Sequence, residues 1–366
     1  MPVDLLITHI RQLWTVEGRE PLVGAAQGAH EPIEDGVVAI ENGAITFAGP
    51  GLEIDTQVIR GPRTQVVDLG LRYSMVPGFV DPHTHVVYAG NRLPELRRRL
   101  AGATYAQIAA EGGGIVSTVE ATRRASAADL ANQTKARLDE MLAAGTTTAE
   151  AKSGYGLDTA TEKRMLEVIR VLNEDHPIDL VPTFMGAHEV PPEYRGRRSE
   201  YVDLVIDEML PACAPLATWC DVFCESGVFT PDESVRILEA GLRHGLKPRI
   251  HADELGASGG SEAAARAGAV SADHLVHATT GGIIALREAG VVATLLPCAA
   301  FFLKLGRFAP ARQMIELGVP VALATDVNPG GGFSPSMAFA MAIACFGMNL
   351  TFEEALAGAT LNAAAA

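Results

Sequence analysis

Short apolar runs alternate with longer stretches of helical periodicity from about residue 75 onward. The apolar runs have the length of buried strands, whereas the longer stretches repeat their apolar positions every three or four residues. Strands joined through helices lie parallel, because each helical crossover returns the chain to the same edge of the sheet. The helical pattern is clearest over residues 127–144, 159–174, 232–245, 259–267 and 281–289. The predicted strands are residues 75–80, 146–151, 180–185, 221–225, 249–252, 272–276, 291–296 and 321–324.

Eight strands, each followed by a crossover, are the number that closes a (β/α)8 TIM barrel. We expect this barrel over residues 74–366. A doubly wound open sheet is the alternative arrangement of such elements. It is disfavoured because no Gly-x-Gly-x-x-Gly motif follows an early strand.

The first 73 residues have a different pattern, with short strands and turns in place of helices. Glu41-Asn42-Gly43 is a strong hairpin signal between two of these strands, because Asn and Gly tolerate the positive φ of a tight turn. We expect a small β-sandwich-like domain over residues 1–73, without catalytic residues. Its predicted strands are residues 4–10, 35–41, 44–48 and 65–68.

Composition and charge restrict the partners of the protein. A net charge of -15 argues against binding to nucleic acid, which requires a basic surface. No apolar run reaches the roughly 20 residues that cross a bilayer, and the first residues do not resemble a signal peptide. The five cysteines are odd in number and scattered, so we expect reduced thiols and a cytoplasmic protein without a membrane partner.

Histidines and aspartates gather just after the predicted strands, where barrel enzymes carry their active sites. His83 and His85 follow the first strand, and residues two apart in an extended chain point to the same side. With His251 after the fifth strand and Asp326 after the eighth, they form a predicted metal site. Imidazole and carboxylate ligands suit zinc or iron better than magnesium or calcium. One ion is expected, because the fourth strand has no lysine that could bridge two.

Two further residues near these strand ends are candidates for catalysis. Glu254, three residues after His251, could move a proton between water and a leaving nitrogen. His274, after the sixth strand, could stabilise the attacking oxygen or a developing oxyanion. The alternatives are structural: Glu254 as a carboxylate favourable at the start of a helix, and His274 as a hydrogen-bonded core histidine.

The segments 77–85 and 251–254, with the strand before Asp326, resemble the amidohydrolase superfamily. Within it, longer blocks are similar to the imidazolonepropionases, the cyclic amidohydrolases of histidine degradation. The resemblance implies that water opens the ring of 4-imidazolone-5-propanoate to give N-formimidoyl-L-glutamate, by metal-activated water with Glu254 as general acid/base. It also implies one zinc or iron ion per subunit on the four ligands named above, and a homodimer. The blocks that carry it are residues 99–105, 112–118, 152–156, 184–188 and 324–330.

The family's substrate contacts are implied at Arg92, Tyr155, His188, Glu254, Asn328, Gly330 and Gly331. An arginine could hold the substrate's propionate through two parallel hydrogen bonds. Judged without the resemblance, Arg92 is one more solvated arginine, as residues 97–99 are expected to be.

The chain departs from the family pattern at two places. Gly331 stands where the family often has Ser or Thr, and the strands that usually complete the small domain after Asn362 are expected to be absent. Two other functions remain open from the sequence. One is another mononuclear amidohydrolase or deaminase acting on a nitrogen heterocycle, which needs no cation for a carboxylate. The other is a non-catalytic metal-binding or scaffolding protein.

Overall fold

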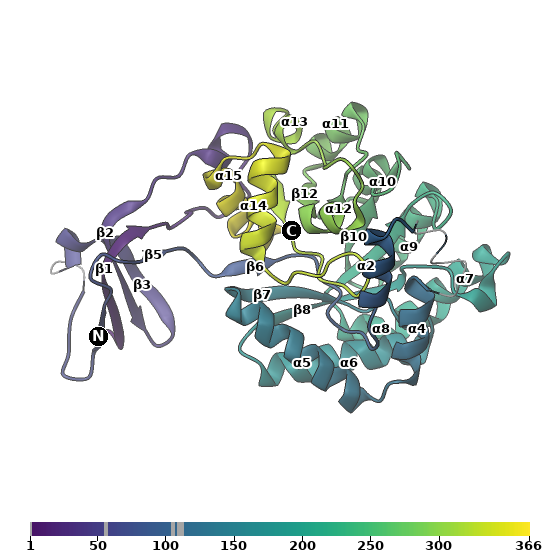
Figure 1. The fold of residues 1–366 in the computed structure, drawn as a ribbon, viewed down its shortest axis with the longest axis horizontal. Coiled ribbons are helices and arrows are strands. Elements are labelled where there is room, and N and C mark those ends of the chain that lie inside the picture. Colours follow the sequence, from purple (N-terminus) through teal and green to yellow (C-terminus); the bar gives the residue numbers. More distant parts are fainter. Residues whose placement is uncertain (1, 55–57, 104–106, 108–112) are drawn as a thin grey trace.

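Eight parallel strands form the wall of a barrel in a computed structural model that describes residues 2–54, 58–103, 107 and 113–366. Neighbouring strands follow one another in chain order, so each helical crossover moves the chain one strand around the barrel (Figure 1). This confirms the predicted TIM barrel. The strands are β6 (Phe79–Asp81), β7 (Thr146–Lys152), β8 (Asp179–Ala187), β9 (Trp219–Cys224), β10 (Lys247–Ala252), β11 (Ser271–His274), β12 (Val292–Leu295) and β13 (Val321–Leu323).

The gap between β6 and β13 is bridged by hydrogen bonds beyond regular strand pairing. The Asp81 carboxylate accepts bonds from the backbone N–H of Thr325, at 3.1 Å, and from its hydroxyl. One step further along, Asp326 N–H donates to the His83 carbonyl at 3.1 Å, and His85 N–H donates to the Val327 carbonyl at 2.9 Å. These bonds hold three predicted metal ligands side by side.

Helices between the strands cover the outside of the barrel. The five helices predicted from periodicity all form, and their ends lie within two residues of the predicted ones. Thr230 begins α9 with a capping box, in which its hydroxyl and the Glu233 carboxylate each accept a backbone N–H of the other. The helices are α2 (Leu93–Leu100), α4 (Ile115–Arg124), α5 (Ala127–Ala143), α6 (Thr159–Asp175), α7 (Arg198–Leu204), α8 (Leu210–Cys213), α9 (Pro231–Arg243), α10 (Gly260–Ala267), α11 (Thr280–Ala289), α12 (Pro297–Leu303), α13 (Ala311–Glu316), α14 (Met337–Met348), α15 (Phe352–Gly358) and α16 (Leu361–Ala365).

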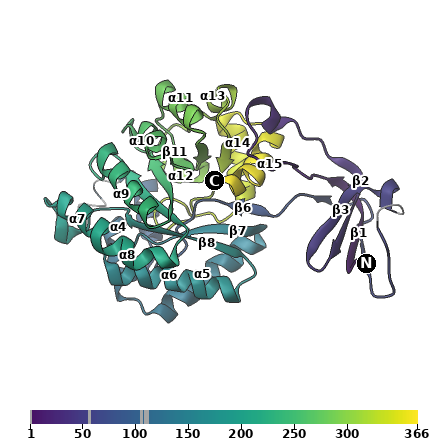
Figure 2. The same ribbon diagram turned by 180° about the vertical axis from the view of Figure 1, so that it is seen from behind.

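A separate five-stranded sheet lies to one side of the barrel (Figures 1 and 2). Its main path runs β3-β2-β1-β4, and β5 also pairs with β1. Asn42 and Gly43 have φ of 52° and 78° in the turn between β2 and β3, which confirms the predicted hairpin. The strands are β1 (Leu5–Leu13), β2 (Ile33–Glu41), β3 (Ala44–Pro50), β4 (Gln65–Asp68) and β5 (Ser74–Met75).

The predicted strand over residues 75–80 is wrong as a single element. Met75 pairs with Leu13 in the small sheet, and the barrel strand begins only at Phe79. Pro77 and Gly78 separate the two pieces; proline has no N–H to donate to a strand partner, and glycine weakens a strand. One continuous apolar run therefore serves two sheets.

Part of the N-terminal region packs on the barrel. After β1 the chain reaches the short helix η1 (Gly24–Gly28), which contacts α15 and α13. Gln27 is fully buried there, and its amide donates to the carbonyls of Val321 and Glu354 and accepts from the Val321 N–H. Viewed from behind, α14 and α15 lie between the small sheet and the barrel strands (Figure 2). Within the described residues, no helix combines the length and apolar character needed to cross a membrane.

Candidate active site

The four predicted metal ligands meet at the carboxyl ends of the strands. The Nε2 atoms of His85 and His251 lie 3.2 Å apart. Asp326 Oδ1 lies 3.6 Å from His83 Nε2 and 3.7 Å from His85 Nε2. Atoms that bind a tetrahedral ion at 2.0–2.1 Å are spaced about 3.3–3.4 Å from one another. The cluster therefore has nearly the dimensions of a metal site.

The hydrogen bonds of the histidines leave the right atoms for a metal. His83 Nδ1 donates to Asp273 at 2.6 Å, and His251 Nδ1 donates to Asp221 at 3.0 Å. With Nδ1 protonated, Nε2 of each ring keeps its lone pair for an ion. His83 Nε2 and Asp326 Oδ1 are buried without a hydrogen-bond partner. Buried polar atoms are rarely left this way unless a metal, water or ligand satisfies them, so the residues present fit a metal ion.

Burial sets the protonation of the cluster. It lowers the pKa of His83 well below the usual value, and neighbouring Lys152 adds to the effect. Burial likewise lowers the pKa of His85, followed by the nearby His188. Both rings are therefore neutral, as metal ligands must be. Burial, and then the charge of Glu254, raises the pKa of Asp326 well above its usual value.

The two candidate catalytic residues border the same cluster. A ring nitrogen of His274 lies within 4.8 Å of ring nitrogens of His83 and His251, which places it close enough to contact a bound ion. Its Nδ1 lies 3.7 Å from Glu254 Oε1. Burial, reinforced by the negative charge of Glu225, raises the pKa of Glu254 to about 8. A carboxyl group that holds a proton near neutral pH is suited to acid and base steps alike.

The backbone around Glu254 is held by hydrogen bonds to two carboxylates, those of Asp253 and Glu225. Asp253 has a φ of 51°, and its carboxylate accepts bonds from the N–H groups of Ser258, Gly260 and Ser261. Glu225 accepts the N–H of Leu255 at 2.9 Å. These contacts fix the backbone on both sides of Glu254.

One cavity of about 570 Å³ brings the predicted catalytic and substrate residues together. Acidic side chains border it near the histidine cluster, and arginines border it near the 328–331 loop. His83 is the one predicted site residue absent from the lining, and it is fully buried. The lining includes His85, Arg92, Arg99, Tyr155, His188, Glu189, Phe223, His251, Glu254, His274, Lys304, Asp326, Asn328, Gly330 and Gly331.

Tyr155 and His188 form a ring wall beside the metal cluster. His188 stacks on His85 with ring centroids 4.8 Å apart, and the Tyr155 ring lies 5.2 Å from His188. His188 Nδ1 donates to the Gly154 carbonyl, and burial lowers its pKa to about 3. A neutral ring with Nδ1 protonated presents Nε2 as an acceptor, which could take a ring N–H of a heterocycle. The buried Glu162 accepts the N–H groups of residues 154, 156 and 157 and thereby holds this loop.

Asn328 and Gly330 are engaged with each other in this structure. Asn328 Oδ1 accepts the N–H groups of Gly330 and Gly331, and its Nδ2 donates to the Asp326 carbonyl. The asparagine therefore holds the loop shape, and the predicted contact of both residues with product stays a prediction. The loop also needs a glycine at 332, because a Cβ there would lie 1.6 Å from the Asp326 carbonyl oxygen.

Several buried charged residues of the site were not assigned a role from sequence. Lys152 is fully buried and donates to Asp221 at 2.7 Å and to Glu150 at 3.0 Å. Arg249 pairs with Asp273 at 3.1 Å. The available signal was a carboxylate inside an apolar strand, as at residue 221, but periodicity gives no indication of its partner.

The expectation that residues 97–99 are all solvated is wrong for Arg99. Arg97 is exposed, whereas Arg99 is only 8% exposed and lines the cavity. A helix separates the two side chains to different faces, which a run of three arginines conceals. Tyr105 and Gly112, in two of the blocks that resemble the imidazolonepropionases, lie outside the described residues.

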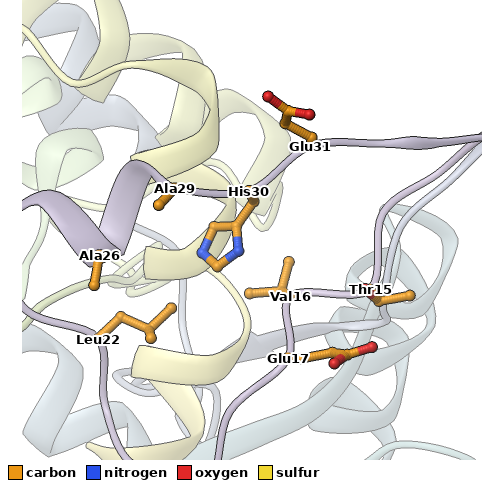
Figure 3. Close-up of a pocket in the computed structure, with 8 residues that line it drawn as sticks. All are labelled: Thr15, Val16, Glu17, Leu22, Ala26, Ala29, His30 and Glu31. Atoms are coloured by element: carbon orange, nitrogen blue, oxygen red, sulfur yellow. The ribbon is translucent and has the colours of Figure 1, made fainter.

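A second cavity, of about 490 Å³, shares no residue with the first. It lies where the chain passes between the small sheet and the barrel, and the His30 ring projects into it beside Val16 and Leu22 (Figure 3). Its described lining contains one histidine, His30, and none of the predicted metal ligands.

Comparison with known proteins gives relatives over the whole chain. No protein-family model matches it. An imidazolonepropionase of Alkaliphilus metalliredigens (strain QYMF) is 49% identical over 369 aligned positions, covering 100% of this chain and 87% of the relative. One of Symbiobacterium thermophilum is 50% identical over 368 positions, covering 100% of this chain and 86% of the relative.

Solved structures agree on the fold. An adenosine deaminase from Xanthomonas campestris with bound zinc superposes with a TM-score of 0.68 at 20% identity, covering 100% of this chain and 80% of that one. A triazine hydrolase variant gives a TM-score of 0.70 at 16% identity, covering 99% and 82%. At such identities the likeness concerns the fold alone.

Proposed function

The chain belongs to the imidazolonepropionase family, and from this membership we propose that it hydrolyses 4-imidazolone-5-propanoate to N-formimidoyl-L-glutamate. The observation that carries the proposal is a single cavity lined by residues of the predicted metal site, by Glu254 with its raised pKa, and by the two arginines Arg92 and Arg99. Another amidohydrolase or deaminase of nitrogen heterocycles is not favoured, because the relatives along the whole chain are imidazolonepropionases.

We assign the metal to His83, His85, His251 and Asp326, whose free atoms face one another. A zinc or iron ion held there would supply a Lewis acid and lower the pKa of water. The protein's part is to keep the His83 and His85 rings neutral through burial, and to orient the His83 and His251 rings through the carboxylates of Asp273 and Asp221.

Glu254 is the proposed proton carrier. Its carboxylate takes a proton from the attacking water and delivers it to the ring nitrogen as the C–N bond breaks. The raised pKa supports the second half of this cycle, since a carboxyl group near its pKa can both accept and release a proton. His274, 3.7 Å away, lies where it can stabilise the negative charge that develops on the carbonyl oxygen.

The remaining contacts orient the substrate. His188 and Tyr155 border the heterocycle on one side, and Arg92, beside Gly330 in the same cavity, binds the propionate tail. Arg92 is only 8% exposed, so its hydrogen bonds to a carboxylate would form largely out of water, where they are strong.

The test is direct. Purified protein is mixed with freshly made 4-imidazolone-5-propanoate, and loss of the substrate's ultraviolet absorbance is followed. We expect turnover, and a Glu254→Gln variant that retains its metal but loses a factor of about 10² to 10⁴ in rate. Full activity in Glu254→Gln would remove Glu254 from the mechanism, and no turnover by the metal-loaded wild type would overturn the proposed function.

Elemental analysis of the same preparation distinguishes zinc from iron and gives the number of ions per chain. The homodimer and the cytoplasmic location stay predictions, which size-exclusion chromatography with light scattering and cell fractionation would check.

A further inference from the structure

Two buried arginines converge on one glycine of the site. Arg92 precedes α2 and Arg99 lies in its last turn; seven residues apart, close to two helical turns, they can reach the same side. Arg99 Nη2 donates to the Gly330 carbonyl at 2.6 Å. Arg92 approaches the same residue so closely that a Cβ on Gly330 would lie 2.2 Å from its Nη1. The two guanidinium groups thus border the 330 backbone together.

The Arg92 guanidinium is held by an acidic neighbour. Its Nε and Nη2 each lie 2.9 Å from Glu95 Oε2, and Glu95 Oε1 accepts the Gly114 N–H at 2.9 Å. This orients Arg92 well, but it also offsets much of the positive charge that would attract a carboxylate.

Arg99 is a second buried arginine beside the same loop. Arg99 is as buried as Arg92, at 8% exposed, and its guanidinium lies 5.8 Å from the centre of the Phe333 ring. Arg99 also lines the cavity, so its guanidinium is within reach of a ligand bound there.

The charges of the cavity are also arranged unevenly. Glu254 and Asp326 lie beside the histidine cluster, whereas Arg92 and Arg99 lie beside Gly330. An anionic tail is attracted to the two guanidinium groups, which favours the orientation of the substrate that places its carboxylate beside them.

We propose that Arg99 is a second specificity-determining residue, which together with Arg92 forms the subsite for the carboxylate of the substrate. This deepens the proposed function and rests on it. The positive charge of Arg99 attracts the carboxylate tail of the substrate, while its hydrogen bond to the Gly330 carbonyl keeps the 330 loop beside that tail.

The test compares charged and neutral tails. Binding of imidazole-4-propanoate and of imidazole-4-propanamide is measured by calorimetry on wild type and Arg99→Met, both loaded with zinc. A hydrogen-bonded charge pair typically changes affinity by about 10- to 100-fold. We therefore expect Arg99→Met to weaken the propanoate by about that factor and the propanamide by less than about threefold. For 4-imidazolone-5-propanoate, KM should rise more than kcat falls.

Matched variants separate charge from loop support. Arg97→Met, on the exposed face of the same helix, should leave both affinities unchanged. Arg99→Lys should recover part of the preference for the propanoate, and Arg99→Gln, which keeps a donor without the charge, should not. The Lys and Gln pair decides the matter if Arg99→Met does not fold.

Equal weakening of the two ligands in Arg99→Met would overturn the proposal, because Arg99 would then only support the 330 loop. Unchanged binding of both would overturn it as well. Failure of the wild type to hydrolyse 4-imidazolone-5-propanoate is a separate result, which contradicts the proposed function.

Discussion

At His83 and His251, one ring nitrogen is bonded to a carboxylate so that the other faces the cluster. The carboxylates are themselves paired, Asp273 with Arg249 and Asp221 with Lys152. In each case a series of hydrogen bonds runs from a buried cation through a carboxylate to an imidazole. Such a series fixes the ring tautomer and raises the basicity of the ligand nitrogen, both of which favour metal binding.

Asp221→Asn should weaken metal binding by about 10- to 100-fold, because Asn binds the His251 Nδ1–H less strongly. The dissociation constant is measured by competition with a chromogenic chelator, on protein shown to be folded by circular dichroism. Asp139→Asn is the matched control, since Asp139 also pairs with a histidine, His176, at 3.2 Å, and neither residue lines the cavity. Equal affinity in the wild type and Asp221→Asn would contradict the role of Asp221.

Among the elements, β13 is only three residues long, yet several distant parts of the chain are hydrogen-bonded to it or to the loop that follows it. Its N-terminal end is hydrogen-bonded to Gln27 and Asn362, so the N-terminal segment and α16 both attach there. The loop after it carries Asp326, whose N–H bonds to the His83 carbonyl. The strand thus connects the packing of the N-terminal region with the closure of the barrel at the site.

Gln27→Leu should lower the free energy of unfolding by about 1–3 kcal/mol, because it leaves the buried Val321 N–H without its partner. Urea unfolding followed by fluorescence measures the change. Activity at 25 °C should remain, since Gln27 does not border the cavity. Gln313→Leu, which removes an amide bonded to Thr280 at the surface, should change stability little. Similar losses in the two variants would show that burial of the Gln27 amide is unimportant.

Over the whole molecule, a net charge of -15 surrounds a site built to take an anion. The difference is resolved locally, because Arg92 and Arg99 line the cavity beside Gly330. The carboxylates of Glu254 and Asp326 lie beside the histidine cluster. Those carboxylates are unfavourable in the metal-free protein, because burial raises the pKa of Glu254 to about 8 and that of Asp326 well above its usual value. A bound cation would relieve this.

Stability of the metal-free protein should therefore fall as pH rises. Native Glu254 keeps its proton up to about pH 8, whereas the unfolded chain loses it near 4.5. Between these values the native state binds more protons, so its stability decreases with pH and levels off above 8. The histidines with lowered pKa act in the opposite sense, because only the unfolded chain binds their protons. Their effect fades above about pH 6.5, where the unfolded histidines lose those protons as well.

Thermal unfolding of chelator-treated protein at pH 7 and pH 8.5 tests this. We expect a lower midpoint at pH 8.5 by about 2 °C, from about 1 kcal/mol per pH unit and group. Glu254→Gln should show a smaller difference, and zinc should raise the midpoint more at pH 8.5. A midpoint independent of pH in metal-free wild type would contradict the burial of these carboxyl groups.

The barrel and the candidate ligands were predictable from local pattern. Apolar runs and helical periodicity marked every barrel strand, and the rule that parallel strand ends share one face placed His83, His251 and Asp326 together. The strand over residues 75–80 was wrong, because an apolar run carries no information on which sheet it joins. Proline and glycine inside it were the only signal.

The sequence by itself determined which residues stand at strand ends, since that depends on neighbours along the chain. Only the tertiary structure decided the partners of each charge: Asp221 with His251 and Lys152, Arg92 with Glu95, Arg99 with Gly330. These contacts join segments that are far apart in the sequence, or residues about one helical turn apart, and their strength depends on burial. Burial is a property of the packed molecule, and for that reason Arg97 and Arg99 look alike in the sequence and differ in the structure.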